Sequence, residues 1–185
     1  EKVLEEPQAR TDMRIYAYSL MPNHWHLILD PLNNGDLSGF MGWLTMTHTQ
    51  RWHAAHNTVG TGHLYQGRYK SFPMQTDNYF LAACRYVERN ALRANLVKHA
   101  EDWKWSSAWR RKFGNEKQKK ILTDWLVAMP ANYSKWLNEP QSEEELEALR
   151  RCVNRGQPYG NERWVRLTAK KFGLESTFRN KGRPK

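Results

Sequence analysis

Apolar and polar residues alternate over residues 13–29 in a pattern that predicts a β-hairpin. Apolar and aromatic residues crowd both arms, and Met21-Pro22-Asn23 between them has the composition of a turn. Because side chains alternate faces along a strand, His24 and His26 share one face of the second arm. The opposite face, which we assign to the core, carries Trp25, Leu27 and Leu29.

Two later stretches repeat apolar residues every three or four positions, the spacing of an amphipathic helix. The first follows the loop signal Asn33-Asn34-Gly35 and runs from Asp36 to about Asn57. The second begins at Thr76 or Asp77 and ends near Ala91. Its inward side carries Phe80, Leu81, Cys84 and Val87, and a second stripe carries Tyr79, Ala83, Tyr86 and Asn90.

Residues 64–73, between the two helices, have the pattern of a loop followed by a short strand. The segment mixes aromatic and basic side chains, so Arg68, Tyr69 and Lys70 are candidates for contacts with a nucleic-acid backbone. An ordinary edge strand with solvated charges explains the same pattern equally well.

The chain changes character after Trp109. Residues 110–120 are basic and polar, as in a linker. Residues 121–137 again contain tryptophans and apolar residues, which predict a short helix that packs on the main domain. Ser142 is followed by three glutamates, which predicts a helix to about Asn154. A last helix is predicted to begin near Gly160, and a basic tail follows it. We therefore divide the chain into a main domain (1–110), a linker and packing segment (111–140) and a helical extension with a basic tail (141–185).

Composition narrows the class of partner. The 185 residues carry a formal net charge of +10, which favours a polyanion, and nucleic acid before membrane because no long apolar run is present. Nine tryptophans allow base stacking as well as core packing. Cys84 and Cys152 form no metal or disulfide pattern, so we expect a reducing compartment. An aromatic core under a basic but inert surface is the alternative.

The histidine pair is the first candidate for chemistry. Residues two apart on a strand lie about 6.6 Å apart, so the imidazoles of His24 and His26 can lean together and hold one divalent ion. Solvated or core histidines explain the pair as well. Tyr86 taken alone is a packing tyrosine, but beside a metal it is the best nucleophile candidate in the chain. Three basic residues flank Tyr86, namely Arg85, Arg89 and Arg93. Their charge could bind a phosphate, and a solvated helix face explains them equally well.

Four segments across residues 10–110 combine into a larger pattern: Pro22-Asn23-His24-Trp25-His26, Leu64-Tyr65-Gln66-Gly67-Arg68-Tyr69, Arg85-Tyr86-Val87-Glu88-Arg89-Asn90 and Trp103-Lys104-Trp105-Ser106-Ser107. In these residues and in their order, the chain resembles the REP-associated tyrosine transposases of the HUH single-tyrosine superfamily. The resemblance implies a bacterial cytoplasmic protein associated with the nucleoid. The resemblance implies an α+β fold, with a ferredoxin-like antiparallel sheet and helices on one face. It adds a helix that delivers one tyrosine, and a mostly helical C-terminal extension completes the expected fold.

The resemblance also implies roles for single residues. His24 and His26 become metal ligands, Asn90 completes the site, and Tyr86 is the nucleophile. The implied reaction cleaves single-stranded DNA beside a hairpin, leaving a 5′-phosphotyrosine and a free 3′-OH. The ion is expected to be Mg²⁺ or Mn²⁺. No membrane partner is expected, and self-association is open.

Three features depart from the family pattern, and the C-terminal residues carry a separate short motif. The family has a further strand before the point where this chain starts, so we interpret the sequence as N-terminally incomplete. Trp25 is bulkier than usual between the histidines, and Asn90-Ala91-Leu92 replaces Asn-Pro. Gly182-Arg183-Pro184 resembles an AT-hook, although we favour a basic tail in which Arg183 makes non-specific phosphate contacts.

Two other function classes fit parts of the pattern. A DNA-binding regulator derived from a transposase would keep the positive charge and lose the chemistry. A small-molecule metal hydrolase could use two histidines on a strand, but its barrel forms need further His and Asp ligands that the sequence does not supply. The residues that separate these classes are His24, His26 and Tyr86, all of them present.

Overall fold

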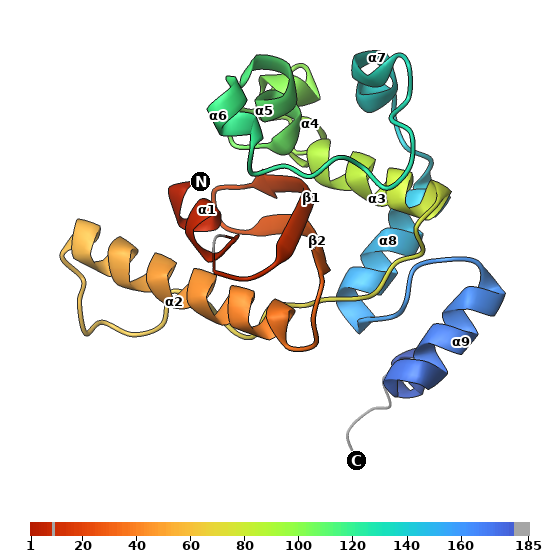
Figure 1. The fold of residues 1–185 in the computed structure, drawn as a ribbon, viewed down its shortest axis with the longest axis horizontal. Coiled ribbons are helices and arrows are strands. Elements are labelled where there is room, and N and C mark those ends of the chain that lie inside the picture. The colour runs from red at the N-terminus through yellow and green to blue at the C-terminus, as the bar shows by residue number, and fades with distance from the viewer. Residues whose placement is uncertain (9, 180–185) are drawn as a thin grey trace.

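The computed structural model describes residues 1–8 and 10–179 and has an α+β fold, as predicted (Figure 1). A two-stranded antiparallel sheet lies among helices, and the part after residue 106 is mostly helical. The elements in chain order are α1 (Lys2–Gln8), β1 (Met13–Leu20), β2 (Trp25–Pro31), α2 (Asp36–His56), α3 (Asn78–Glu88), α4 (Asn90–Arg93), η1 (Ala100–Asp102), α5 (Ser107–Phe113), α6 (Glu116–Lys119), α7 (Tyr133–Asn138), α8 (Glu143–Arg155), α9 (Glu162–Phe172) and η2 (Glu175–Phe178).

The predicted hairpin is confirmed, with one irregularity in β1. β1 and β2 pair from Met13 opposite Pro31 to Leu20 opposite Trp25, and the register shifts around Tyr16. An extra residue in one strand changes the phase of side-chain alternation. As a result, Tyr16 and its neighbour Ala17 both pack on the α3 side.

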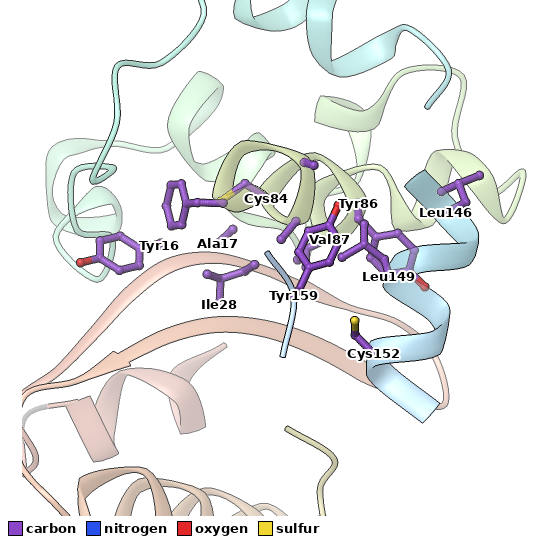
Figure 2. Close-up of a cluster of buried hydrophobic side chains, with 13 residues drawn as sticks. Tyr16, Ala17, Ile28, Cys84, Tyr86, Val87, Leu146, Leu149, Cys152 and Tyr159 are labelled. Atoms are coloured by element: carbon purple, nitrogen blue, oxygen red, sulfur yellow. The ribbon is translucent and has the colours of Figure 1, made fainter. Parts of the chain in front are cut away.

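Helices cover both faces of the hairpin (Figure 1), whereas the sequence predicted them on one face. α1 and α2 bury one face, where the core includes Leu4, Ile15, Tyr18, Phe40 and Met41. α3 and α8 cover the other (Figure 2), with Ile28, Cys84, Val87, Leu149 and Cys152 among the packed side chains. Both faces are covered because both strands present apolar side chains on each side of the pleat. Helix α3, which carries Tyr86, therefore packs between the sheet and the C-terminal part of the chain.

The outer edge of β1 is closed by the chain after residue 104 rather than by a third described strand. The backbone N–H of Leu20 donates to the carbonyl of Trp105 at 2.9 Å, and that of Thr123 donates to the carbonyl of Ile15 at 2.9 Å. Between these points the indole Nε1 of Trp125 donates to the carbonyl of Tyr16 at 3.0 Å. Loop and side-chain groups thus satisfy an edge that would otherwise be exposed.

A buried carboxylate joins α3 to this edge. Glu88 is completely buried, and its Oε1 accepts a hydrogen bond of 2.5 Å from the hydroxyl of Ser107. The same hydroxyl accepts from the backbone N–H of Tyr18 at 2.9 Å, so it links α3 to β1. Tyr133 donates to the other carboxylate oxygen, and Arg111 lies 3.5 Å from Oε1. Burial raises the pKa of Glu88, whereas the three partners oppose that rise.

Two segments differ from their predicted form. Residues 64–73 contain no strand, because their backbone pairs with no neighbouring strand; the nearest pairing is an isolated bridge from Met74 to Tyr159. Residues 110–120, predicted as a linker, contain the end of α5 and all of α6. Arg110 within them is 2% exposed and lies 3.0 Å from Glu5. The Arg110 side chain is buried and paired with the half-exposed Glu5 of α1, which explains why this basic segment packs instead of extending into solvent.

The other helices and both cysteines agree with the predicted pattern. α2, α8 and α9 lie close to where the sequence predicted helices, and Ser142 caps α8 by accepting from the N–H of Glu145. The short helix predicted within residues 121–137 is α7, which begins only at Tyr133. Cys84 and Cys152 are buried free thiols. Among the described residues, no helix has the length and apolar character needed to cross a membrane. Gly182-Arg183-Pro184 lies outside the described residues.

Replacing Ser107 by alanine should destabilise the fold by about 2 kcal/mol or more, because it leaves both the Glu88 carboxylate and the Tyr18 N–H short of a partner in a buried site. Chemical denaturation of the variant measures this loss. Ser134, which is exposed on α7, supplies the control: Ser134→Ala should change the free energy of unfolding by less than about 0.5 kcal/mol. Equal effects of the two substitutions would contradict the role given to Ser107.

Candidate functional site

The two predicted metal ligands lie at the start of β2. His24 is the last residue of the turn, where its carbonyl accepts from the N–H of Met21 at 2.8 Å, and His26 is the second residue of the strand. Their rings lie 5.2 Å apart between centroids and are nearly perpendicular. The strand thus brings the imidazoles together on the face covered by α3, as the alternation predicted.

Asn23 orients His24. Its side-chain oxygen lies 2.7 Å from Nδ1 of His24, so Nδ1 carries the proton and donates. The lone pair of Nε2 then points away from the turn. This is the arrangement in which a histidine is held for metal binding, because the second ring nitrogen fixes the tautomer and the ring orientation.

Helix α3 and its continuation α4 place Tyr86 and Asn90 above the histidines. Asp77 caps α3 by accepting from the N–H of Tyr79 at 2.9 Å. The helical path continues past Arg89, since the N–H of Arg93 donates to the carbonyl of Arg89 at 2.8 Å. Residues four apart on a helix share a face. Tyr86 and Asn90 therefore point together toward the sheet.

The four predicted residues meet in one place. The Tyr86 ring lies 5.7 Å from the His26 ring between centroids, and Nδ2 of Asn90 lies 3.3 Å from Nε2 of His24. They come from two elements far apart in sequence. A phenol, two imidazoles and an amide thus form one cluster, which is the set needed for a nucleophile beside a metal ion.

Arg93 contacts two members of this cluster. Its guanidinium carbon lies 4.1 Å from the centroid of the Tyr86 ring, and its NH2 group donates to Oδ1 of Asn90 at 2.8 Å. A further bond of 3.3 Å runs from NH1 to the backbone carbonyl of Tyr86. The predicted phosphate-binding arginine therefore lies directly over the candidate nucleophile.

The surroundings of both histidines favour the neutral form of the imidazole at neutral pH. Burial, followed by the charges of His24 and Arg93, lowers the pKa of His26 to about 4. Burial and the charge of Arg93 also lower the pKa of His24. Neutral imidazole is the form that coordinates metals.

Two imidazole nitrogens and the amide of Asn90 are the side-chain groups that would hold a divalent ion here, although the amide nitrogen, and not the oxygen, faces His24 in this structure. Across the described ranges no group of three or more His, Cys, Asp or Glu side chains is placed to hold a metal ion. Imidazole donors suit Mn²⁺ and other transition metals, while the amide oxygen also suits Mg²⁺.

Tyr86 is more enclosed than the sequence predicted. We placed it on a face distinct from the packed stripe of α3, but only 9% of Tyr86 is exposed, and it belongs to the same packed cluster as Val87 (Figure 2). α8 explains the difference, because Leu146 and Leu149 cover a side of α3 that periodicity alone would leave open. This packing limits the rotamers of the ring and so fixes its direction.

Arg85 and Arg89, predicted to face DNA, hold the chain between α7 and α8. Arg85 donates to the carbonyls of Glu139 and Pro140, and Arg89 donates to the carbonyl of Leu137 at 2.8 Å. These bonds satisfy carbonyls at the C-terminal end of α7, where a helix has unpaired acceptors. Their guanidinium groups are thus engaged within the protein, and any contact with DNA stays a prediction.

The strip at Arg68, Tyr69 and Lys70 lies on the other face of the hairpin. Arg68 and Lys70 are exposed, while Tyr69 packs against the core beside α2. Next to them a groove of about 630 Å³ lies between α2 and residues 62–69. Its lining includes Ser38, Gly42, Thr45, His63, Tyr65 and Arg68.

Only the thickness of the hairpin separates this groove from the histidines. The Trp25 ring lies 6.5 Å from that of Tyr65, and the neighbouring residue His26 points to the opposite face. The structure therefore brings together the metal and nucleophile candidates and keeps the basic strip apart from them. Arg183 lies outside the described residues.

Sequence analysis missed two roles in the site. Asn23 was interpreted only as a turn residue, although its position directly before His24 could have suggested a side chain able to reach the ring. Arg93 was expected to contact phosphate, and its bond to Asn90 was not foreseen. The i to i+3 spacing of Asn90 and Arg93 was the available signal.

Comparison with known proteins gives one match. Residues 1–90, just under half of the 185, match the family model described as "Transposase IS200 like". A search of curated proteins and a search of solved structures each found no match. The match supports a DNA-processing enzyme of the transposase family and includes His24, His26, Tyr86 and Asn90. Residues 1–90 are thus similar in sequence to an IS200-like transposase domain.

Proposed function

We propose that this protein is a metal-dependent single-strand DNA endonuclease and strand transferase of the REP-associated type, acting beside hairpins in repeat DNA. The observation that supports this most is the convergence of His24, His26, Asn90 and Tyr86 from two distant elements. A packing role alone does not explain two neutral imidazoles that face a tyrosine and an arginine. The family match over residues 1–90 supports the same class of reaction.

In the proposed reaction the phenolic oxygen of Tyr86 attacks a phosphodiester phosphorus. The new O–P bond forms as the bond to the 3′ oxygen breaks, so the products are a 5′-phosphotyrosine and a free 3′-OH. A bound divalent ion would polarise the scissile phosphate. Arg93 offers a fixed positive charge to the same phosphate. Because the phosphotyrosine keeps the bond energy, another 3′-OH can reverse the step without a nucleotide cofactor.

Tyr86→Phe should abolish the covalent adduct with a single-stranded hairpin oligonucleotide while DNA affinity stays within about twofold, because only the attacking hydroxyl is lost. Denaturing gels and mass spectrometry of the trapped peptide measure this. Tyr79→Phe, on the same helix, is the matched control and should keep forming the adduct. A nucleotide found on Tyr65, Tyr69 or Tyr79 would refute the assignment.

His24→Ala together with His26→Ala should reduce cleavage by at least about 10³-fold, because the phosphate loses its polarising ion. A chelator should do the same to the unmodified protein, and Mn²⁺ or Mg²⁺ should restore it. Oligonucleotide binding, measured by fluorescence anisotropy, should change little in the double variant. His56→Ala, an exposed histidine of α2, should cleave normally. Cleavage that survives both chelator and double substitution would remove the metal from the mechanism.

Arg68→Ala with Lys70→Ala should weaken binding of single-stranded DNA and lower the slope of log affinity against log salt by about 1.4, the value expected for two lost phosphate contacts. Anisotropy titrations between 50 and 300 mM salt, roughly the range in which such slopes are measured, give both quantities. Lys117→Ala, an exposed lysine of α6, should leave the slope unchanged. Cleavage of a fully paired duplex at the single-strand rate would contradict the proposed substrate.

A further inference from the structure

Arg93 holds the amide of Asn90 in one orientation. Oδ1 of Asn90 accepts from the Arg93 guanidinium at 2.8 Å, and Nδ2 consequently faces Nε2 of His24 at 3.3 Å. The amide nitrogen is a donor with no lone pair available for a metal ion, whereas the oxygen is an acceptor. In this orientation Asn90 presents the wrong atom to the position between the histidines.

Turning the amide over brings Oδ1 toward His24 but creates a conflict with Arg93. Nδ2 would then face the guanidinium, so two donors would meet and the bond of 2.8 Å would be lost. Asn90 can therefore use its oxygen toward Arg93 or toward a metal ion beside His24, but not both. The two arrangements exclude one another.

Arg93 also lacks an anionic partner. Among the described residues, no carboxylate lies within ion-pair distance of its guanidinium, which is only partly exposed and rests on the Tyr86 ring. A partly buried cation with neutral contacts is a good binding group for a phosphate, since a charge-assisted bidentate bond is stronger than a bond to an amide oxygen. A phosphate in reach of the Tyr86 hydroxyl would lie beside this group.

We propose that Arg93 exchanges partners, from the oxygen of Asn90 in the free protein to a DNA phosphate in the complex, and that this exchange completes the metal site. The inference rests on the proposed function, because it needs both a phosphate and an ion at the same site. In the free protein Arg93 keeps Asn90 turned away and adds a positive charge that opposes a second cation. Binding of DNA removes both obstacles, so metal and substrate bind cooperatively.

The test measures Mn²⁺ affinity without DNA, by the loss of the free-ion signal in electron paramagnetic resonance of the full chain. Arg93→Met keeps the packing stem and removes the donors and the charge. We expect it to bind Mn²⁺ about tenfold more tightly than the unmodified protein, within the usual range for coupled sites. Adding Asn90→Ala should reduce that gain to less than about threefold, because the released amide oxygen is then missing.

Controls separate the exchange from other effects. Lys98→Met removes an exposed positive charge five residues further along the chain and should leave Mn²⁺ affinity unchanged. Arg93→Leu, which also lacks donors and charge, repeats the test if Arg93→Met fails to fold by circular dichroism. Mn²⁺ binding equal to or weaker than that of the unmodified protein would overturn the proposal, as would an equal gain with and without Asn90.

A different result would refute the proposed function instead. If no variant binds Mn²⁺, with or without a single-stranded oligonucleotide in the Tyr86→Phe background, the histidines are not a metal site. The triple variant His24→Ala, His26→Ala, Tyr86→Phe is measured with the same oligonucleotide. The Mn²⁺ bound in that sample is bound by DNA phosphates alone, and this amount is subtracted from the other measurements. Failure of the partner exchange and failure of the proposed function are thus distinguishable. Only failure of the proposed function abolishes Mn²⁺ binding in every variant.

Discussion

The buried contact between Glu88 and Ser107 determines where the candidate nucleophile lies. Glu88 and Tyr86 are two residues apart on α3, so they point to nearly opposite sides of the helix. Ser107 bonds the carboxylate and the backbone of β1 together. Once this side of α3 is fixed to the edge of the sheet, the rotation of the helix is fixed as well. Tyr86 then has to face β2, where the histidines lie.

The same contact explains why the C-terminal half of the chain matters to a site made of N-terminal residues. Ser107 begins α5, and Tyr133 of α7 bonds the same carboxylate. α8 covers the remaining side of α3, with Leu149 only 1% exposed. The family match covers residues 1–90, yet the surroundings of Tyr86 depend on residues beyond 100. The extension therefore has a structural role in the site, whatever else it binds.

The site carries positive charge, and among the described residues no carboxylate pairs with the guanidinium of Arg93. Two neutral imidazoles, an amide and a phenol surround the guanidinium of Arg93. Such a cluster attracts an anion before it attracts a cation. A phosphate that neutralises Arg93 changes the field at the histidines, which is a simple physical basis for coupling substrate binding to metal binding.

The sequence by itself determined the hairpin, the long helices and the identity of the four central residues. Alternation put His24 and His26 on one face, and helical spacing put Tyr86 above Asn90, because both patterns depend only on local backbone geometry. Tertiary structure alone decided that α8 encloses Tyr86, that Arg85 and Arg89 cap α7, and that residues 110–120 pack against α1. It also turned the amide of Asn90 toward Arg93. These outcomes depend on partners distant in sequence, and a periodic pattern carries no information on which side chain an exposed charge will meet.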